Sequence, residues 1–251
     1  GKLSKRDGDR LGFPIYAMNW TDPKSGETSK GFREMGFLPE AFVNMLALLG
    51  WNNGTEQEIF SIEELIEKFS IERISKSGAK FDIEKAKWFS HEYIKKADVS
   101  TIRYQVLDDL EKRAIAVKSE EYLDQVITLV KERMTFLQDF WEQGSFFFQA
   151  PEHYDLDSVK PKWTEAKTGY FEKLVAQLNS LSDNKWNATY LEASFKTLAE
   201  ESGLKTGEVM LPFRIMLVGG KFGPGVFDIA ALLGRDETTE RIQKALGAFQ
   251  S

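Results

Sequence analysis

Apolar residues recur every three or four positions along most of this 251-residue chain. The longest run follows Ser119, where polar residues fill the opposite face. Its apolar side chains are Leu123, Val126, Ile127, Val130, Met134 and Leu137. Because an α-helix places such residues on one side, the spacing predicts an amphipathic helix that begins after Ser119 and carries this apolar face through Leu137. Similar runs elsewhere predict a mainly α fold with little sheet.

Capping residues predict where several of these helices begin. Ser61 and Glu64 have the spacing of a capping box, in which each side chain bonds the other's backbone N–H. Asp82 and Ser100 are predicted to cap the next two helices. Pro212 opens a short apolar stretch that ends at Gly219 and Gly220.

Composition excludes several classes of function. With no cysteine, the chain has no disulfide, thiol nucleophile or cysteine-ligated zinc. His91 and His153 lack a ligand partner at helical spacing, so no metal site is predicted. No apolar run approaches the roughly 18 residues of a membrane span. The net charge of −6 argues mildly against a nucleic-acid partner, unless the basic residues gather on one face.

The N-terminal stretch Lys2-Leu3-Ser4-Lys5-Arg6 suits a polyphosphate ligand. Lysines supply positive charge, a hydroxyl supplies a hydrogen bond, and a loop can close over the phosphates. Taken alone, such a stretch is more often an ordinary solvated end of a chain.

The order of five segments carries a more specific signal. The segments are KLSKR at 2–6, GFLPEAFVNMLALLGW at 36–51, GAKFDIEKAKWFSHEYIKK at 78–96, LVKERMTFLQDF at 129–140 and GEVMLPFRIMLVGGKFGPGVFDIAALLGRDETTERIQKAL at 207–246. Together they resemble the bacterial glutamyl-tRNA synthetase family of class I synthetases, over almost the whole chain. The first resembles the family's form of the KMSKS signature, and the last resembles its C-terminal anticodon-binding signature.

The resemblance implies an ATP-binding role for Lys2, Ser4 and Lys5, which match the loop that stabilises the ATP phosphates. The full-length enzyme would use ATP and Mg²⁺ to join glutamate to tRNA(Glu). The family's nucleotide-binding fold lies upstream of this loop. We therefore expect the chain to be a C-terminal fragment, inactive by itself, with no complete catalytic set and no bound cofactor.

The resemblance also implies anticodon contacts. Arg133 matches the family arginine that reads the third anticodon base, and a guanidinium offers a planar pair of donors to base acceptors. Arg214 matches a second anticodon-contacting arginine, and Pro224 and Val226 match a loop that packs on the other bases. From the residues alone, Arg133 could be a solvated arginine, Arg214 the partner of an acid, and Pro224 part of a turn.

Two features depart from the family pattern. The stretch from about 11 to 31 is longer than usual, and its turn residues between aromatics predict an inserted hairpin. Position 223 is glycine where the family often has a small hydroxyl residue, which puts a contact there in doubt.

Three regions are predicted. Residues 1–97 hold the KMSKS-like loop and a stem-contact region, and 98–160 and 161–251 form a two-part, all-helical anticodon-binding module. The implied partners are tRNA(Glu), ATP and glutamate, with no membrane, and the implied state is a cytoplasmic monomer. Two alternatives stay open: a nondiscriminating synthetase that also charges tRNA(Gln), and a non-catalytic helical scaffold that binds protein partners.

Overall fold

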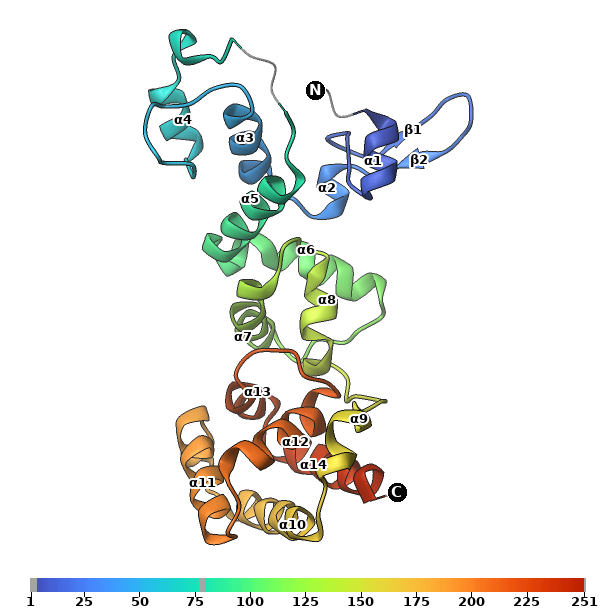
Figure 1. The fold of residues 1–251 in the computed structure, drawn as a ribbon, viewed down its shortest axis with the longest axis vertical. Helices are drawn as coiled ribbons and strands as arrows, with labels where there is room; N and C mark the ends of the chain where they lie inside the picture. The colour runs from blue at the N-terminus through green and yellow to red at the C-terminus, as the bar shows by residue number, and fades with distance from the viewer. Residues whose placement is uncertain (1–3, 77–79, 251) are drawn as a thin grey trace. The chain divides into compact units, whose positions relative to one another are not determined.

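The computed structural model describes residues 4–76 and 80–250. The prediction of a mainly α fold is confirmed, since one two-stranded sheet accompanies many helices in the described part of the chain. Contacts divide the chain into two compact units (Figure 1). Unit 1 comprises 1–114 and 131–141, and unit 2 comprises 115–130 and 142–251. These units are defined by packing alone, so the predicted three-part functional division stays a prediction.

Unit 1 consists of short helices around an aromatic core. Phe13, Phe32 and Phe37 pack edge to face in that core, with ring centroids 5.0–6.2 Å apart. The elements are α1 (Lys5–Leu11), β1 (Trp20–Thr21), β2 (Thr28–Ser29), α2 (Phe32–Met35), α3 (Pro39–Leu48), α4 (Ile62–Lys68), η1 (Ile71–Arg73), α5 (Ile83–Lys96), α6 (Val99–Lys112) and η2 (Lys131–Arg133).

The predicted hairpin is present in unit 1. Strands β1 and β2 pair antiparallel, with Trp20 opposite Ser29. Asp22 accepts the backbone N–H of Lys24 at 2.8 Å and so stabilises the turn. Gly26 has a φ of +74°, which suits glycine because it has no Cβ to clash.

The predicted helix starts are confirmed at two positions and wrong at a third. Ser61 and Glu64 form the full capping box of α4, and Asp82 accepts the backbone N–H of Lys85 to cap α5. Ser100, however, lies inside α6, whose N-cap is Asp98. Asp98 makes no side-chain capping hydrogen bond; its carbonyl accepts the backbone N–H of Thr101 at 2.9 Å, so the first turn already includes Ser100.

The predicted helix begins after Ser119 as expected, but its continuation through Leu137 is wrong. Helix α7 (Glu120–Val130) ends at Val130, and the chain continues through the 3₁₀ turn η2. The carboxylate of Asp139 accepts the backbone N–H groups of Thr135 and Phe136, both at 2.8 Å. In a continuing helix, these N–H groups would bond backbone carbonyls of that helix. Here they bond the side chain of Asp139, the first residue of α8 (Asp139–Gly144).

A buried asparagine ties three parts of unit 1 together. Asn44 on α3 is fully buried, and its Oδ1 accepts the backbone N–H of Phe60 at 2.9 Å and the hydroxyl of Tyr93 at 2.6 Å. The Phe60 carbonyl oxygen also lies 2.6 Å from the Tyr93 hydroxyl, so the two acceptors share its single proton. Burial raises the pKa of Tyr93 to about 12, so the phenol keeps this proton well into the alkaline range.

Replacing Asn44 with alanine should destabilise unit 1. The change leaves the buried N–H of Phe60 without its acceptor, which costs about 1–3 kcal/mol. We expect a lower urea midpoint for the Asn44→Ala variant, measured by circular dichroism. Glu67→Ala, on the exposed face of α4, is the control and should leave the midpoint near the original value. An unchanged midpoint for Asn44→Ala would contradict the structural role given to this network.

Unit 2 is a helical assembly with its own aromatic core. The ring of Phe195 on α11 lies 5.0 Å from Phe213 on α12 and 5.4 Å from Phe227 on α13. Figure 1 shows α10 to α14 gathered around one another. Besides α7, the elements of unit 2 are η3 (Ser145–Phe147), α9 (Leu156–Val159), η4 (Lys160–Lys162), α10 (Glu165–Ser180), η5 (Asp183–Lys185), α11 (Ala188–Glu201), α12 (Thr206–Val218), α13 (Val226–Leu233) and α14 (Arg235–Gln250).

Pro212, where the short apolar stretch begins, lies inside α12. A proline at this point supplies no N–H for the carbonyl four residues earlier. Burial of Pro212 and its neighbours Phe213 and Met216 offsets that loss, since each removes apolar surface from water. Across the described residues, no helix is long and apolar enough to cross a membrane.

Candidate functional site

The KMSKS-like segment is only partly described. Lys2 lies outside the described residues, whereas Ser4 and Lys5 begin α1. Ser4 is the N-cap: its hydroxyl donates to Asp7 at 2.5 Å and accepts the backbone N–H of Asp7 at 3.2 Å. Hydrogen bonds from Ser4 hold the pKa of the Asp7 carboxyl below its ordinary value. The Ser4 hydroxyl therefore serves the helix end in this structure.

Lys5 contacts the β1–β2 hairpin, and the sequence did not predict this contact. Its Nζ lies 3.8 Å from a carboxylate oxygen of Glu27 and 5.9 Å from the ring centroid of Trp20. The Trp20 ring in turn stacks on Tyr16 at 5.0 Å. The side chains of Lys5 and Glu27 are both exposed enough to be well solvated. Their ion pair is therefore weak and leaves Lys5 available to a phosphate.

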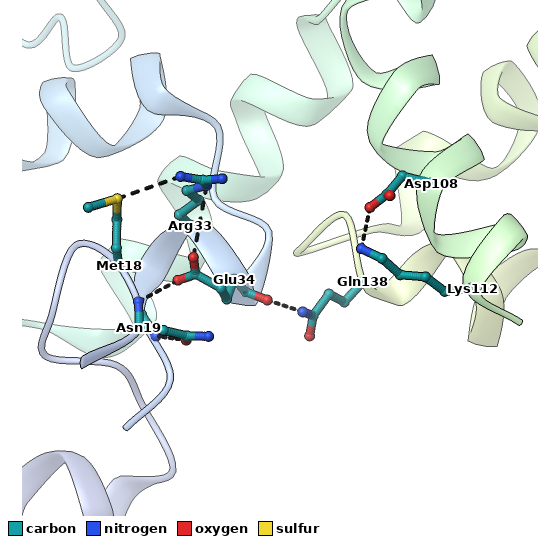
Figure 2. Close-up of polar contacts among 8 residues, drawn as sticks. Met18, Asn19, Arg33, Glu34, Asp108, Lys112 and Gln138 are labelled. Atoms are coloured by element: carbon teal, nitrogen blue, oxygen red, sulfur yellow. Dashed lines mark hydrogen bonds and ion pairs between the residues drawn. The ribbon is translucent and has the colours of Figure 1, made fainter. Parts of the chain in front are cut away.

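The hairpin is anchored at its base to other parts of unit 1. Glu34 on α2 accepts the backbone N–H of Asn19 at 2.8 Å, and its own carbonyl accepts a hydrogen bond from Gln138 (Figure 2). Lys30 also donates to Gln138, at 2.6 Å. Figure 2 shows Arg33 reaching toward both Met18 and Glu34. Both ends of the hairpin are thus anchored: Asn19, just before β1, is bonded to Glu34, and Lys30, just after β2, is bonded to Gln138 in the segment that follows η2.

A cleft of about 750 Å³ lies beside this anchor. Lys30, Arg33 and Lys112 contribute positive charge to its lining, and Glu34, Asp108 and Asp109 contribute negative charge. Lys112 pairs with Asp108, as Figure 2 shows, and that carboxylate raises the lysine's pKa. Since the charges balance, the cleft has no net attraction for a polyanion.

Arg133 ends η2 on the surface of unit 1. Its neighbours fix the backbone: Lys131 donates to the carbonyl of Ala97 at 2.8 Å, and the carbonyl of Met134 lies 2.9 Å from Nδ1 of His91. Met134 is fully buried, whereas Arg133 is exposed. Within residues 4–76 and 80–250, no carboxylate lies within ion-pair distance of Arg133. The guanidinium is therefore presented to solvent from a fixed segment.

Arg214 takes a different position, on α12 in unit 2. Its Nη1 donates to the carbonyls of Phe222, Gly223 and Pro224, at 3.0, 3.3 and 2.7 Å. The guanidinium thus holds three consecutive backbone groups in the loop between α12 and α13. The alternative interpretation, in which Arg214 simply pairs with an acid, does not account for these hydrogen bonds to the loop.

The structure brings Pro224 and Val226 together with Arg214, but both of these apolar side chains are buried. Gly223, just before them, has a φ of +95°, and a Cβ there would lie 3.1 Å from the ring of Phe146. The glycine that departs from the family pattern is thus required by this loop's conformation and packing. Phe222 is the loop's exposed apolar side chain, and sequence reasoning passed over it.

No group of three or more His, Asp or Glu side chains is placed to hold a metal ion within the portion of the chain described. The candidate residues instead fall into two sets. Ser4, Lys5 and Arg133 belong to unit 1, and Arg214 with the loop through Val226 belongs to unit 2.

Family models match most of this chain. Residues 83–246 match the model described as an anticodon binding domain. Residues 22–88 match the model of the class I tRNA synthetase (E and Q) catalytic domain. The first match covers α5 through most of α14, and so includes Arg133 and the Arg214 loop.

Individual relatives agree with these matches. The glutamate–tRNA ligase of Porphyromonas gingivalis is 46% identical over 246 residues, which is 98% of this chain and 48% of the relative. That of Christiangramia forsetii is 45% identical over 250 residues, or 100% of this chain and 49% of the relative. This chain spans about half the length of the curated relatives it matches.

Solved structures show the same fold. A glutamate tRNA ligase from Elizabethkingia meningosepticum, in complex with its amino acid, gives a TM-score of 0.92 at 41% identity, over 99% of this chain and 49% of that one. The synthetase from Elizabethkingia anophelis gives 0.88 at 42%, over 98% and 48%. The chain therefore belongs to the anticodon-binding-domain family, and over nearly its whole length it is homologous to bacterial glutamate–tRNA ligases, which are class I tRNA synthetases.

Proposed function

We propose that this chain is the tRNA-reading part of an enzyme that joins glutamate to tRNA(Glu) with ATP. The observation that carries the proposal is the anticodon-binding match over residues 83–246, within a chain 45–46% identical to glutamate–tRNA ligases. Recognition is then its main task. Phosphate contacts hold the tRNA in register, and contacts to base edges test the anticodon.

In this proposal two sets of residues serve anticodon recognition. Arg133 offers its exposed guanidinium to one base, because its planar donors fit the acceptors of a base edge. Arg214 supports the loop that carries Pro224 and Val226. Since those side chains are buried, their contribution to base recognition is to shape the loop surface, together with Phe222.

The KMSKS-like segment serves the ATP step in the same proposal. Lys2 and Lys5 would supply positive charge to the phosphates, with Ser4 ordering the start of α1 beside them. Glutamate and Mg²⁺ would be held by the rest of the full-length enzyme, and this chain by itself is expected to be inactive. The monomeric state and cytoplasmic location stay predictions.

Salt-dependent tRNA binding tests the proposal. We expect the chain to bind unmodified tRNA(Glu), with an affinity that falls roughly tenfold or more between 50 and 200 mM salt, because bound phosphates release counterions. The measurement is filter binding at several salt concentrations, with tRNA(Gln) and an unrelated tRNA for comparison.

Failure to bind at low salt would shift the test to the full-length protein. If that protein charges tRNA(Glu), the missing half supplies most of the affinity and the proposed function stands. If neither binding nor charging occurs, the proposed function is wrong and the protein scaffold alternative takes its place.

A further inference from the structure

Phe222 presents an aromatic ring to solvent from the loop between α12 and α13. The side chain is 45% exposed. Its ring meets Phe146 edge to face, with centroids 5.9 Å apart, and Phe146 is itself buried. One part of the Phe222 ring therefore rests on the core of unit 2, while the remainder is open.

The backbone beside this ring is shaped to receive it. A Cβ at Gly220 would lie 2.8 Å from Cε1 of Phe222, which is closer than real Cβ atoms come. Position 220 must therefore be glycine for the ring to take this place. The ring thus rests against Phe146, in space that the absence of a side chain at position 220 leaves open.

The main chain on the other side of Phe222 is fixed as well. Arg214 donates to the carbonyls of Phe222, Gly223 and Pro224, so the loop does not have to become ordered when a ligand arrives. Lys221, immediately before the ring, is exposed and lies 3.4 Å from Asp155. The loop thus places an aromatic face, on a backbone held by Arg214, next to the cation of Lys221.

We propose that Phe222 is the stacking platform for one unstacked base of the tRNA anticodon loop. The inference rests on the proposed function and deepens it by naming the contact. Unpaired bases are bound by stacking on aromatic side chains, with cations nearby for the phosphates. Because every base has a π face, Phe222 supplies affinity and position, and the arginine contacts supply the choice of base.

The test uses the full-length enzyme and its charging of tRNA(Glu). Phe222→Ala should lower kcat/KM for tRNA by about 5- to 150-fold, through KM, which is the range measured for loss of one base-stacking contact. Phe222→Tyr keeps the ring and should retain most of the activity. Phe69→Ala is the matched control, because Phe69 is a similarly exposed aromatic that packs on Trp51 at 5.9 Å. Thermal melting of each variant checks that it folds.

A set of tRNAs with one abasic anticodon nucleotide then identifies the stacked base. If Phe222 stacks a base, removing the ring costs little or nothing further once that base has been removed. Additive costs at all three positions, or an unchanged kcat/KM for Phe222→Ala, would overturn the inference. Loss of every anticodon base without effect on the unmodified enzyme would instead refute the proposed function.

Discussion

Replacing Arg133 with alanine in the full-length enzyme is expected to lower kcat/KM for tRNA(Glu) by about 5- to 150-fold. That range corresponds to the 1–3 kcal/mol of discrimination that one bidentate base contact provides. The same change should narrow the preference for tRNA(Glu) over tRNA(Gln), because the lost contact is to a base edge. Charging kinetics with both tRNAs measure the two effects together.

The structure gives a reason to expect a local effect from this change. Arg133 is exposed, while Lys131 and Met134 on either side of it are tied to other parts of unit 1. Truncating the side chain removes the guanidinium and leaves these backbone anchors in place. Urea unfolding of Arg133→Ala should therefore match the unmodified protein within about 0.5 kcal/mol.

Arg73 provides the matched control. Like Arg133, it is an exposed arginine at the third position of a 3₁₀ turn in unit 1. Arg73→Ala should leave tRNA discrimination unchanged. If Arg133→Ala also leaves it unchanged, Arg133 is not the base reader. If the unmodified enzyme already charges both tRNAs equally, the nondiscriminating alternative is correct.

Local sequence patterns account for most of the helical framework. Ser61 with Glu64 and Asp82 each cap the helix they were expected to cap, because capping depends on a few adjacent residues. The hairpin is also local, since Asp22 and Gly26 set its turn. Elements whose signals lie within four or five residues were thus predictable.

Contacts between distant residues accompany the place where prediction failed. The apolar spacing continues through Met134 and Leu137, yet α7 ends at Val130, and the segment after it is bonded to Ala97 and His91, far away in the sequence. Pro212 lies within α12, where it is buried. Periodicity records which residues become buried, and it does not record which backbone groups will be bonded from elsewhere.

For the candidate sites, too, the sequence selects residues but does not show what those residues contact. Motif resemblance selected Arg133 and Arg214, but only the structure separates an arginine open to solvent from one bonded to three carbonyls. Phe222 was overlooked because an aromatic in a loop has no periodic partner. The nearby pair of Gly220 and Gly223 was the available signal, since glycines around an aromatic often permit close packing.

The second large effect is expected from Arg214→Met, which keeps a long apolar stem and removes the donor. Three loop carbonyls then lose their charged partner, and hydrogen bonds to charged groups contribute about 1.5–3 kcal/mol. We expect a lower urea midpoint and faster amide exchange in the 219–225 loop. Weaker charging of tRNA(Glu) should accompany these changes.

The decisive comparison is between Arg214→Met, Phe222→Ala and the double variant. If Arg214 acts by holding the loop, the first change already misplaces the ring, and adding the second costs little more. If Arg214 reads a base by itself, the two losses multiply. Charging kinetics for the three variants distinguish these outcomes, with Phe69→Ala combined with Arg214→Met as the additive reference. A double variant whose loss equals the product of the single losses would therefore show that Arg214 and Phe222 act independently, and Arg214 would return to the role of a direct base contact.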